Sequence, residues 1–253
     1  MRRGSFSPLS SPKLWNGPMS ESKPKRFYTD VTLSEGEGGY LIALDGRIAK
    51  TAGRAPLGAP QKPLAEAIAA EWTAQDEVID LATMPLTRLQ GFALDGGAAG
   101  RTQWTDTVLS YLGSDLLCYR APDAELAKRQ ADLWQPVLDR LGARWGERFT
   151  VTEGIMAVEQ PDGLKRCAGE RLSQLAAGEL YAVKLLTEIT GSAALAFALE
   201  GGEANAEEVF AAARLDETYQ EEKWGVDEEA AARAANIRRD FDDVVRFLEL
   251  SRA

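Results

Sequence analysis

The sequence of 253 residues contains no histidine. This absence excludes catalysis by Ser-His-Asp or Cys-His groups, zinc sites that contain histidine, and a histidine general base. Carboxylate, lysine and tyrosine chemistry stays open.

Cysteine is scarce as well, since Cys118 and Cys167 are the only two and no Cys-x-x-Cys pair is present. Two separated thiols cannot complete a thiolate zinc site, and they are typical of a protein that folds in a reducing compartment. We therefore favour free thiols over a structural disulfide.

Long apolar runs and phosphate-binding loops are also missing. No apolar run reaches the length of about 18 residues that a helix needs to cross a membrane, so we expect no insertion into a membrane. The glycine-rich stretch 96–100 lacks the Gly-Lys-Ser or Gly-Lys-Thr ending of a phosphate loop and does not follow a strand. We therefore expect no bound nucleotide and no other cofactor.

Acidic residues outnumber basic ones, with 39 Asp and Glu against 29 Lys and Arg, and the formal net charge is −10. Binding to nucleic acid requires clustered positive charge, so this balance argues against a nucleic-acid partner. It suits a protein partner with a basic or arginine-bearing face. The alternative is that most of these charges only keep the protein soluble.

Basic charge gathers at the amino end, where residues 1–26 carry six basic side chains and one acidic one. Residues 1–25 are rich in Ser, Pro and Lys and lack apolar periodicity, so we expect a disordered N-terminal segment. Arg2 and Arg3 are not followed by the apolar core of a signal peptide. We hypothesise that Met19 is the natural start, and detection of Arg2 or Arg3 in native peptides would exclude it.

Residues 26–100 have the pattern of a β-rich N-terminal domain that also contains one or two helices. Two β-prone runs flank Asp45-Gly46, which is the strongest short signal for a hairpin because its turn needs positive φ at both central residues. Pro63 then begins a helix at a position where its missing N–H is not needed. A second helical pattern covers residues 86–95.

Residues 101–253 have the pattern of a helical C-terminal domain. Apolar residues recur at helical spacing in 102–112, 123–145, 162–177, 179–200, 206–225 and 227–250. The stretch 179–200 is apolar nearly all round, which places it at the centre of its domain. The seam from Ala230 to Leu248 packs either within the chain or against another copy. We therefore expect an α+β fold, with a small β-containing N-terminal domain followed by a mainly α-helical C-terminal domain.

One helical pattern, from about Ala206 to Gly225, differs from the others in the middle of its apolar face. Residues at spacings of three and four along it are Phe210, Ala213, Glu217, Gln220 and Trp224. The stripe begins apolar, turns acidic and amide-bearing, and ends in an aromatic ring. A buried carboxylate needs a partner, which either this chain or a second protein supplies. Glu217, Gln220 and Trp224 are therefore candidate partner-binding residues, and a solvated face is the alternative for Glu217.

Four further residues enter the candidate set. Glu221 and Glu222 are adjacent acids on the same helix, and such acids usually form a solvated face. Trp72 has the spacing of a core anchor, with partner contact as the alternative. Arg88 pairs either within the chain or with a partner. A carboxylate-dependent enzyme built from paired acids would require a deep pocket with two close carboxylates.

Five short motifs together resemble a known family, the ATP synthase assembly chaperones that attend the alpha subunit of the catalytic head. The matching pieces are Leu44-Asp45-Gly46-Arg47 with Lys50-Thr51, Leu64-Ala65 through Glu71-Trp72 and Gln75, Met84 to Leu89, Ser114 to Arg120, and Tyr219-Gln220 with Lys223-Trp224-Gly225. They occur in the family's order. Mitochondrial members usually carry His-Asp soon after Trp-Gly, whereas Val226-Asp227 follows here, so the sequence resembles the bacterial branch.

The resemblance implies a chaperone without enzymatic activity, cofactor or metal. Such a protein holds the free alpha subunit and masks the surface that later meets the beta subunit, because that surface is otherwise an aggregation hazard. The family depends on an acidic residue before Trp-Gly, which by position falls on Glu217, with Glu221 and Glu222 as alternatives. A bacterial member acts in the cytoplasm, and a eukaryotic one in the mitochondrial matrix.

The leading alternative is a generic acidic helical adaptor, which binds some other protein and has no enzymatic activity. Its acidic face would accept any partner of suitable charge. Co-purification separates the two hypotheses, because recovery of the alpha subunit favours the chaperone and recovery of a different stoichiometric partner favours the adaptor.

Overall fold

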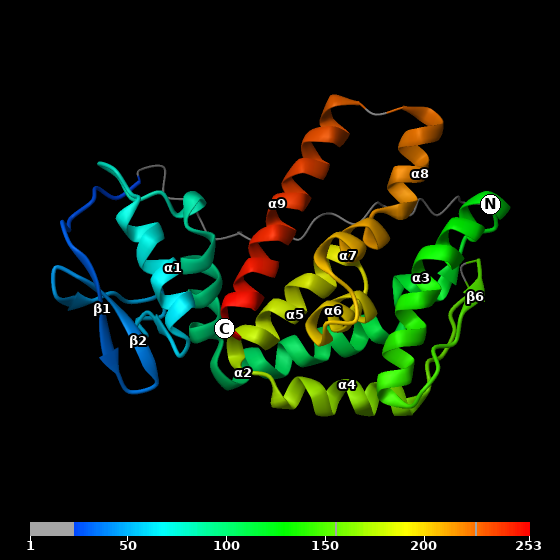
Figure 1. Ribbon diagram of the computed structural model, residues 1–253, viewed down its shortest axis with the longest axis horizontal. Helices are drawn as coiled ribbons and strands as arrows, with labels where there is room; N and C mark the ends of the chain where they lie inside the picture. Colours follow the sequence, from blue (N-terminus) through cyan, green and yellow to red (C-terminus); the bar gives the residue numbers. More distant parts are fainter. Residues whose placement is uncertain (1–22, 155, 226) are drawn as a thin grey trace.

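The structure is a computed structural model, and it describes residues 23–154, 156–225 and 227–253 (Figure 1). Most of the segment 1–25, which we expect to be disordered, and the hypothesis on Met19 lie outside these residues. Lys23 and Pro24 contact the body of the molecule. The Lys23 ammonium lies 2.5 Å from the Asp80 carboxylate, and the Pro24 carbonyl accepts the N–H of Ile79.

The N-terminal unit is built on an antiparallel sheet. In the described part of the chain its strands are β1 (Val31–Gly36), β2 (Gly39–Leu44), β3 (Arg47–Ile48) and β4 (Gly58–Ala59). β2 pairs with each of the other three strands. The predicted hairpin turn is confirmed, because Asp45 and Gly46 have positive φ angles of 47° and 77° and lead directly from β2 into β3.

Helix α1 (Lys62–Thr73) covers one face of this sheet. It begins with Pro63 in its first turn, as the sequence predicts. Leu64 and Ile68 are buried on the helix and share the hydrophobic core with Ile42 of β2. A short 3-10 helix, η1 (Leu81–Thr83), then leads to the helical unit.

Helix α2 (Pro85–Gly113) joins the two units. The sequence predicts separate helices over 86–95 and 102–112, and α2 does consist of two helical segments that meet at a kink between these ranges. The only irregularity within α2 is at Gly97, whose φ of 53° and ψ of −150° break the regular helix. The expected domain boundary after residue 100 falls inside α2, so a division there stays a prediction.

Glu71 fixes α1 to the first turn of α2. Its carboxylate accepts hydrogen bonds from the N–H groups of Leu86 and Thr87, over 2.8 and 2.7 Å, and from the Thr87 hydroxyl over 2.7 Å. The first N–H groups of a helix have no acceptor within the helix, and negative charge is favoured beside them. Burial raises the pKa of Glu71. This carboxylate therefore holds the N-terminal unit against the helical unit.

The helical unit confirms the α+β class. Its helices are α3 (Ala124–Trp145), α4 (Asp162–Gln174), α5 (Ala177–Thr190), α6 (Ala193–Gly201), α7 (Ala206–Ala213), α8 (Leu215–Trp224) and α9 (Glu228–Leu250). Between α2 and α3 lie a 3-10 helix, η2 (Leu116–Cys118), and the strand β5 (Tyr119–Arg120), which pairs in parallel with β6 (Thr152–Glu153).

The apolar stretch 179–200 forms parts of two helices rather than the single helix that we predict. Gly191 ends α5 with a positive φ of 69°, which favours glycine. The Ser192 hydroxyl then accepts the N–H of Leu195 and begins α6. The central position is confirmed, because α6 is buried along almost its whole length.

Asp115 connects η2 to the first turn of α6. Its carboxylate accepts hydrogen bonds from the Ser192 hydroxyl over 2.6 Å and from the N–H of Ala194 over 2.9 Å. It also accepts the N–H of Leu117 over 3.1 Å. Burial raises the pKa of Asp115 to about 6. Asp115 thus forms a fully buried set of hydrogen bonds between η2 and α6, inside the helical unit.

The seam of α9 packs within the chain over its C-terminal half. Phe241, Val244 and Leu248 are buried in the common core, where α9 lies against α5 and α2. Ala230 and Ala234, nearer the start of the helix, are only half-buried. Figure 1 shows this first half of α9 rising away from the body, joined to α8 at its upper end.

Candidate partner-binding site

The helix predicted over residues 206–225 is two helices, α7 and α8, separated at Arg214. This residue has φ of −101° and ψ of 7° and ends the regular geometry of α7. α7 directs Phe210 toward the core, where its ring centroid lies 5.2 Å from that of Phe241. The prediction of one continuous stripe is therefore wrong, because the break separates its apolar half from its polar half.

Glu217, Gln220 and Trp224 lie together on the solvent side of α8, and we call them the exposed face of α8. The Glu217 side chain is 50% exposed and Trp224 is 78% exposed. Spacings of three and four residues place all three on one side of the helix. Of the alternatives that the sequence leaves open for Glu217, a buried network within the chain is not what forms, since this carboxylate is half exposed and lies 3.6 Å from the Arg214 guanidinium. Its role in partner binding stays a prediction.

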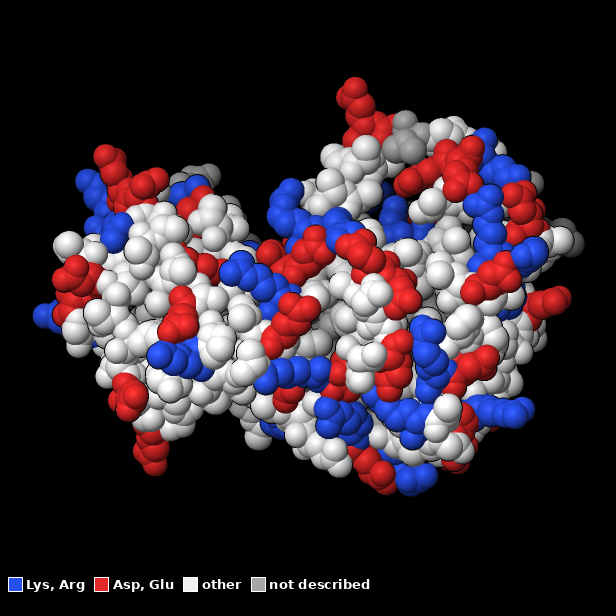
Figure 2. All heavy atoms as spheres, in the orientation of Figure 1, with Lys and Arg blue, Asp and Glu red and all other residues white. Residues whose placement is uncertain are grey.

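Glu221 and Glu222 are both paired inside the chain. The Arg214 guanidinium lies 3.3 Å from the Glu221 carboxylate, and Arg129 of α3 donates to Glu222 over 2.6 Å. These two glutamates therefore flank the exposed face, with part of their charge already neutralised. Figure 2 shows acidic side chains gathered over α8 and the start of α9, with basic side chains beside them.

Polar contacts hold α8 on α3. The Lys223 ammonium donates to Glu125 over 2.8 Å, and the Tyr219 hydroxyl donates to Asp123 over 2.9 Å. Lys223 lowers the pKa of Glu125, and the N–H of Leu126, followed by Tyr219, lowers the pKa of Asp123. Both carboxylates therefore stay ionised well below neutral pH, which preserves these contacts.

Asp216 is part of the contact with α3 and was missed by the sequence analysis. Its carboxylate accepts a hydrogen bond from the Gln130 amide over 2.7 Å, and burial raises its pKa. Adjacent acids on a helix point in different directions, so the pair Asp216-Glu217 already held the signal for one inward and one outward carboxylate. Asp216 therefore attaches α8 to α3 while Glu217 faces solvent.

Trp72 lies in the N-terminal unit. Its ring makes an edge contact with Tyr28, with centroids 5.7 Å apart, and the Tyr28 hydroxyl donates to the Trp72 carbonyl over 2.7 Å. The indole Nε1 is buried and has no hydrogen-bond acceptor among the described residues. These contacts attach the segment before β1 to α1, on the opposite side of α9 from α8 (Figure 1).

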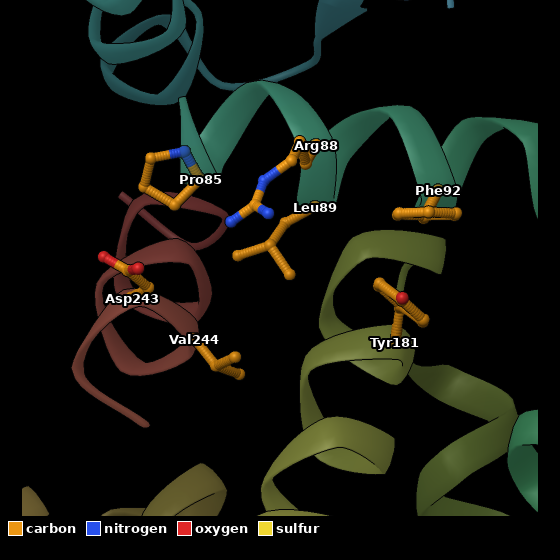
Figure 3. Close-up of a pocket in the computed structure, with 7 residues that line it drawn as sticks. All are labelled: Pro85, Arg88, Leu89, Phe92, Tyr181, Asp243 and Val244. Atoms are coloured by element: carbon orange, nitrogen blue, oxygen red, sulfur yellow. The ribbon is translucent and has the colours of Figure 1, made fainter. Parts of the chain in front are cut away.

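Arg88 lies in a hollow between α2, α5 and α9, shown in Figure 3. The hollow is lined by Pro85, Arg88, Leu89, Phe92, Tyr181, Asp243 and Val244. The Nε atom of Arg88 is buried and has no hydrogen-bond acceptor in the described part of the chain. Burial raises the pKa of Asp243, and the Arg88 charge opposes that effect. The structure thus places Arg88 beside α9, and it does not bring Arg88 or Trp72 to the exposed face of α8.

The structure also bears on metal binding, on the Cys118 thiol and on membrane-spanning helices. Residues 23–154, 156–225 and 227–253 hold no group of three or more His, Cys, Asp or Glu side chains arranged to bind a metal. Burial raises the pKa of Cys118 to about 12, so its thiol is protonated at neutral pH. Within the same residues, no helix combines the length and apolar character needed to cross a membrane.

The fold and the exposed face define a class: a mainly helical α+β protein with an outer helix that carries an exposed tryptophan. The family described as ATP12 chaperone protein matches residues 25–142. With 37% sequence identity and a TM-score of 0.85, the crystal structure of Atp12 from Paracoccus denitrificans covers 90% of this chain and 98% of its own. The chain therefore belongs to the ATP12 chaperone family, whose members act in ATP synthase assembly.

Two further relatives agree with this assignment. The Atu1473 protein from Agrobacterium tumefaciens has a TM-score of 0.84 and 41% identity, with 89% of this chain and 85% of that chain covered. The mitochondrial protein atp12 from Schizosaccharomyces pombe is 24% identical over 228 residues, which is 85% of this chain and 78% of the relative. The family resemblance in the sequence motifs is thus confirmed.

Proposed function

We propose that this chain binds the free alpha subunit of ATP synthase and covers the surface that later contacts the beta subunit. The observation that carries the proposal is the exposed face of α8, where Trp224 is 78% exposed beside Glu217 and Gln220. A large aromatic side chain in this position is typical of the centre of a protein interface. Membership of a chaperone family in ATP synthase assembly supports a subunit of that enzyme as the partner.

The chemistry of the surface indicates the kind of client segment that it binds. Trp224 offers a ring face to apolar or guanidinium groups, and Glu217 offers a carboxylate within the same face. Glu221 and Glu222 form an acidic rim beside it. Such a surface suits a client region with apolar area and arginine side chains.

Release of the client follows from competition. The beta subunit binds the same surface of the alpha subunit, so it displaces the chaperone once it is present. Because release is an exchange of partners, the proposal needs neither nucleotide nor metal and no enzymatic step. Trp72 belongs to α1, which lies across α9 from α8 (Figure 1), and Arg88 lines the hollow between α2, α5 and α9. A client that binds α8 reaches them only by extending across α9.

We infer that this chaperone acts where the alpha subunit is assembled. That place is the bacterial cytoplasm, in agreement with the motif after Trp224, and the mitochondrial matrix for a eukaryotic member.

Refolding of purified alpha subunit tests the proposal. Diluted from denaturant alone, the subunit should aggregate and scatter light, and an equimolar amount of this chain should suppress the scattering and elute with it as a complex. Unchanged scattering and separate elution would remove the alpha subunit as the client. Recovery from a lysate of a different stoichiometric partner would then support the adaptor alternative.

A further inference from the structure

α8 is joined to the body by a different kind of contact from its neighbours. Among its residues, Leu215 alone packs against the hydrophobic core, and Tyr219 is 5% exposed but is not part of that core. Val209 and Ala212 of α7, by contrast, are fully buried in it. Residues 216–223 contain no aliphatic side chain, and Tyr219 is the one aromatic residue among them.

Two cationic side chains, from Arg129 and Lys223, lie over the ring of Tyr219. The Arg129 guanidinium and the Lys223 ammonium each lie 5.1 Å from the centre of its ring. The same two cations form ion pairs between the helices, Arg129 with Glu222 at 2.6 Å and Lys223 with Glu125 at 2.8 Å. We call these two pairs the α3–α8 ion pairs. All four partners are more than one third exposed, so salt screens their attraction.

Both ends of α8 carry a break in helical geometry. Arg214 separates it from α7 with φ of −101° and ψ of 7°. Gly225 follows it with φ of 84° and ψ of 169°, a conformation that is essentially restricted to glycine. α8 is therefore a short segment between two points where the chain direction can change without unwinding α7 or α9.

We propose that α8 is a hinged arm that separates from α3 and returns, with the α3–α8 ion pairs as the contact that opens. Packing of α8 on the main hydrophobic core is confined to Leu215 at the pivot. The hydrogen bonds from Gln130 to Asp216 and from Tyr219 to Asp123 break together with the ion pairs when the arm opens. Client arginines are direct competitors of Arg129 and Lys223 for the same carboxylates, so client binding favours the open arm. This last consequence rests on the proposed function, whereas the opening itself requires no client.

Hydrogen exchange of the full chain without any client tests the hinge. A helix of 10 residues is marginal when it stands alone, so the released arm loses its internal hydrogen bonds and exchanges quickly. Between about 0.1 M and about 1 M NaCl the Debye length falls from about 10 to about 3 Å. Over this change we expect exchange in α8 to accelerate at least about fivefold and exchange in α7 and α5 to change less than about twofold.

A pair of variants isolates the ion pairs. Arg129→Ala combined with Lys223→Ala should give fast exchange in α8 at both salt concentrations. The control Lys128→Ala removes an exposed pair with Asp132 on the same helix α3 and should behave like the unmodified chain. Salt-insensitive exchange in α8, or equal acceleration of α7 and α8, would overturn the hinge. The salt series on the unmodified chain decides the question even if the double variant does not fold.

Discussion

Arg129 of α3 donates a hydrogen bond to Glu222 of α8 over 2.6 Å, although 93 residues separate the two in the chain. Together with the contacts of Asp216, Tyr219 and Lys223 to α3, it orients α8 relative to solvent. With Glu222 turned toward α3, the face that carries Glu217, Gln220 and Trp224 points outward. α8 thus has a polar inner side and an outer side with an exposed aromatic ring. A surface helix of this kind can bind a partner without being part of the core.

Trp224→Ala should weaken binding of the alpha subunit by about tenfold to a hundredfold, because a tryptophan at an interface centre contributes strongly to affinity. Stability should change by less than about 0.5 kcal/mol, since the side chain is outside the core. Titration calorimetry and urea unfolding measure the two effects. Met156→Ala is the matched control, because Met156 is 76% exposed but does not lie on α8. Equal affinity of the two variants would contradict the role of Trp224.

Glu217→Lys should also weaken binding, because it places a positive charge in the surface that we propose for client arginines. The far-ultraviolet circular dichroism should stay unchanged, since the Glu217 side chain is half exposed. Glu37→Lys makes the same change of charge at an exposed position of the N-terminal unit and serves as the control. A Glu217 variant that binds as well as the Glu37 variant would remove Glu217 from the site.

Glu71→Ala should lower the free energy of unfolding by about 1–3 kcal/mol, because three donors at the start of α2 lose their acceptor. Urea unfolding measures the loss. Glu66→Ala on the same helix removes only an exposed pair with Lys62 at 3.6 Å, and we expect it to cost less than about 0.5 kcal/mol. Similar losses in both variants would show that the cap on α2 does not hold the two units together.

The buried carboxyl of Asp115 should make the free energy of unfolding depend on pH. Its folded pKa of about 6 exceeds the ordinary value of 3.8, so the folded protein binds a proton that the unfolded chain lacks between these two values. The contribution of this group to stability therefore rises as the pH falls from about 7 to about 4, by about 2 kcal/mol.

Asp115→Asn isolates that contribution, because the amide does not titrate. The difference in unfolding free energy, unmodified chain minus variant, should increase by about 2 kcal/mol as the pH falls from about 7.5 to about 4. Urea unfolding across this range measures it, and titration of every other carboxylate cancels in the difference. A difference that is constant with pH would show that Asp115 does not hold a raised pKa.

Local chemistry explains which elements the sequence predicts well. The Asp45-Gly46 turn follows from the positive φ that both positions require, and the start of α1 follows from Pro63. The breaks at Gly191 and Arg214 are different. Gly191 lies in a stretch whose uniform apolarity hides a stop signal, and Arg214 is no helix breaker. Its break arises because α7 packs on the core whereas α8 packs on α3.

In the candidate site, too, the sequence predicts local features but not contacts between distant segments. Periodicity selects the face with Glu217, Gln220 and Trp224, but it leaves open whether Glu217 is buried or solvated, and the structure shows a half-exposed side chain. Which acids are paired depends on Arg129 and Glu125 of α3, far away in the sequence. Helical spacing carries no information on such contacts, and for that reason the attachment of α8 to α3 emerges only from the structure.

Binding of purified alpha subunit to this chain, with and without the beta subunit, is the most direct test of the proposed function. The account predicts a complex of the chain with the alpha subunit that dissociates when the beta subunit is added, because both compete for one surface. Failure to bind the alpha subunit, or a complex that persists as the alpha and beta subunits assemble, would contradict it.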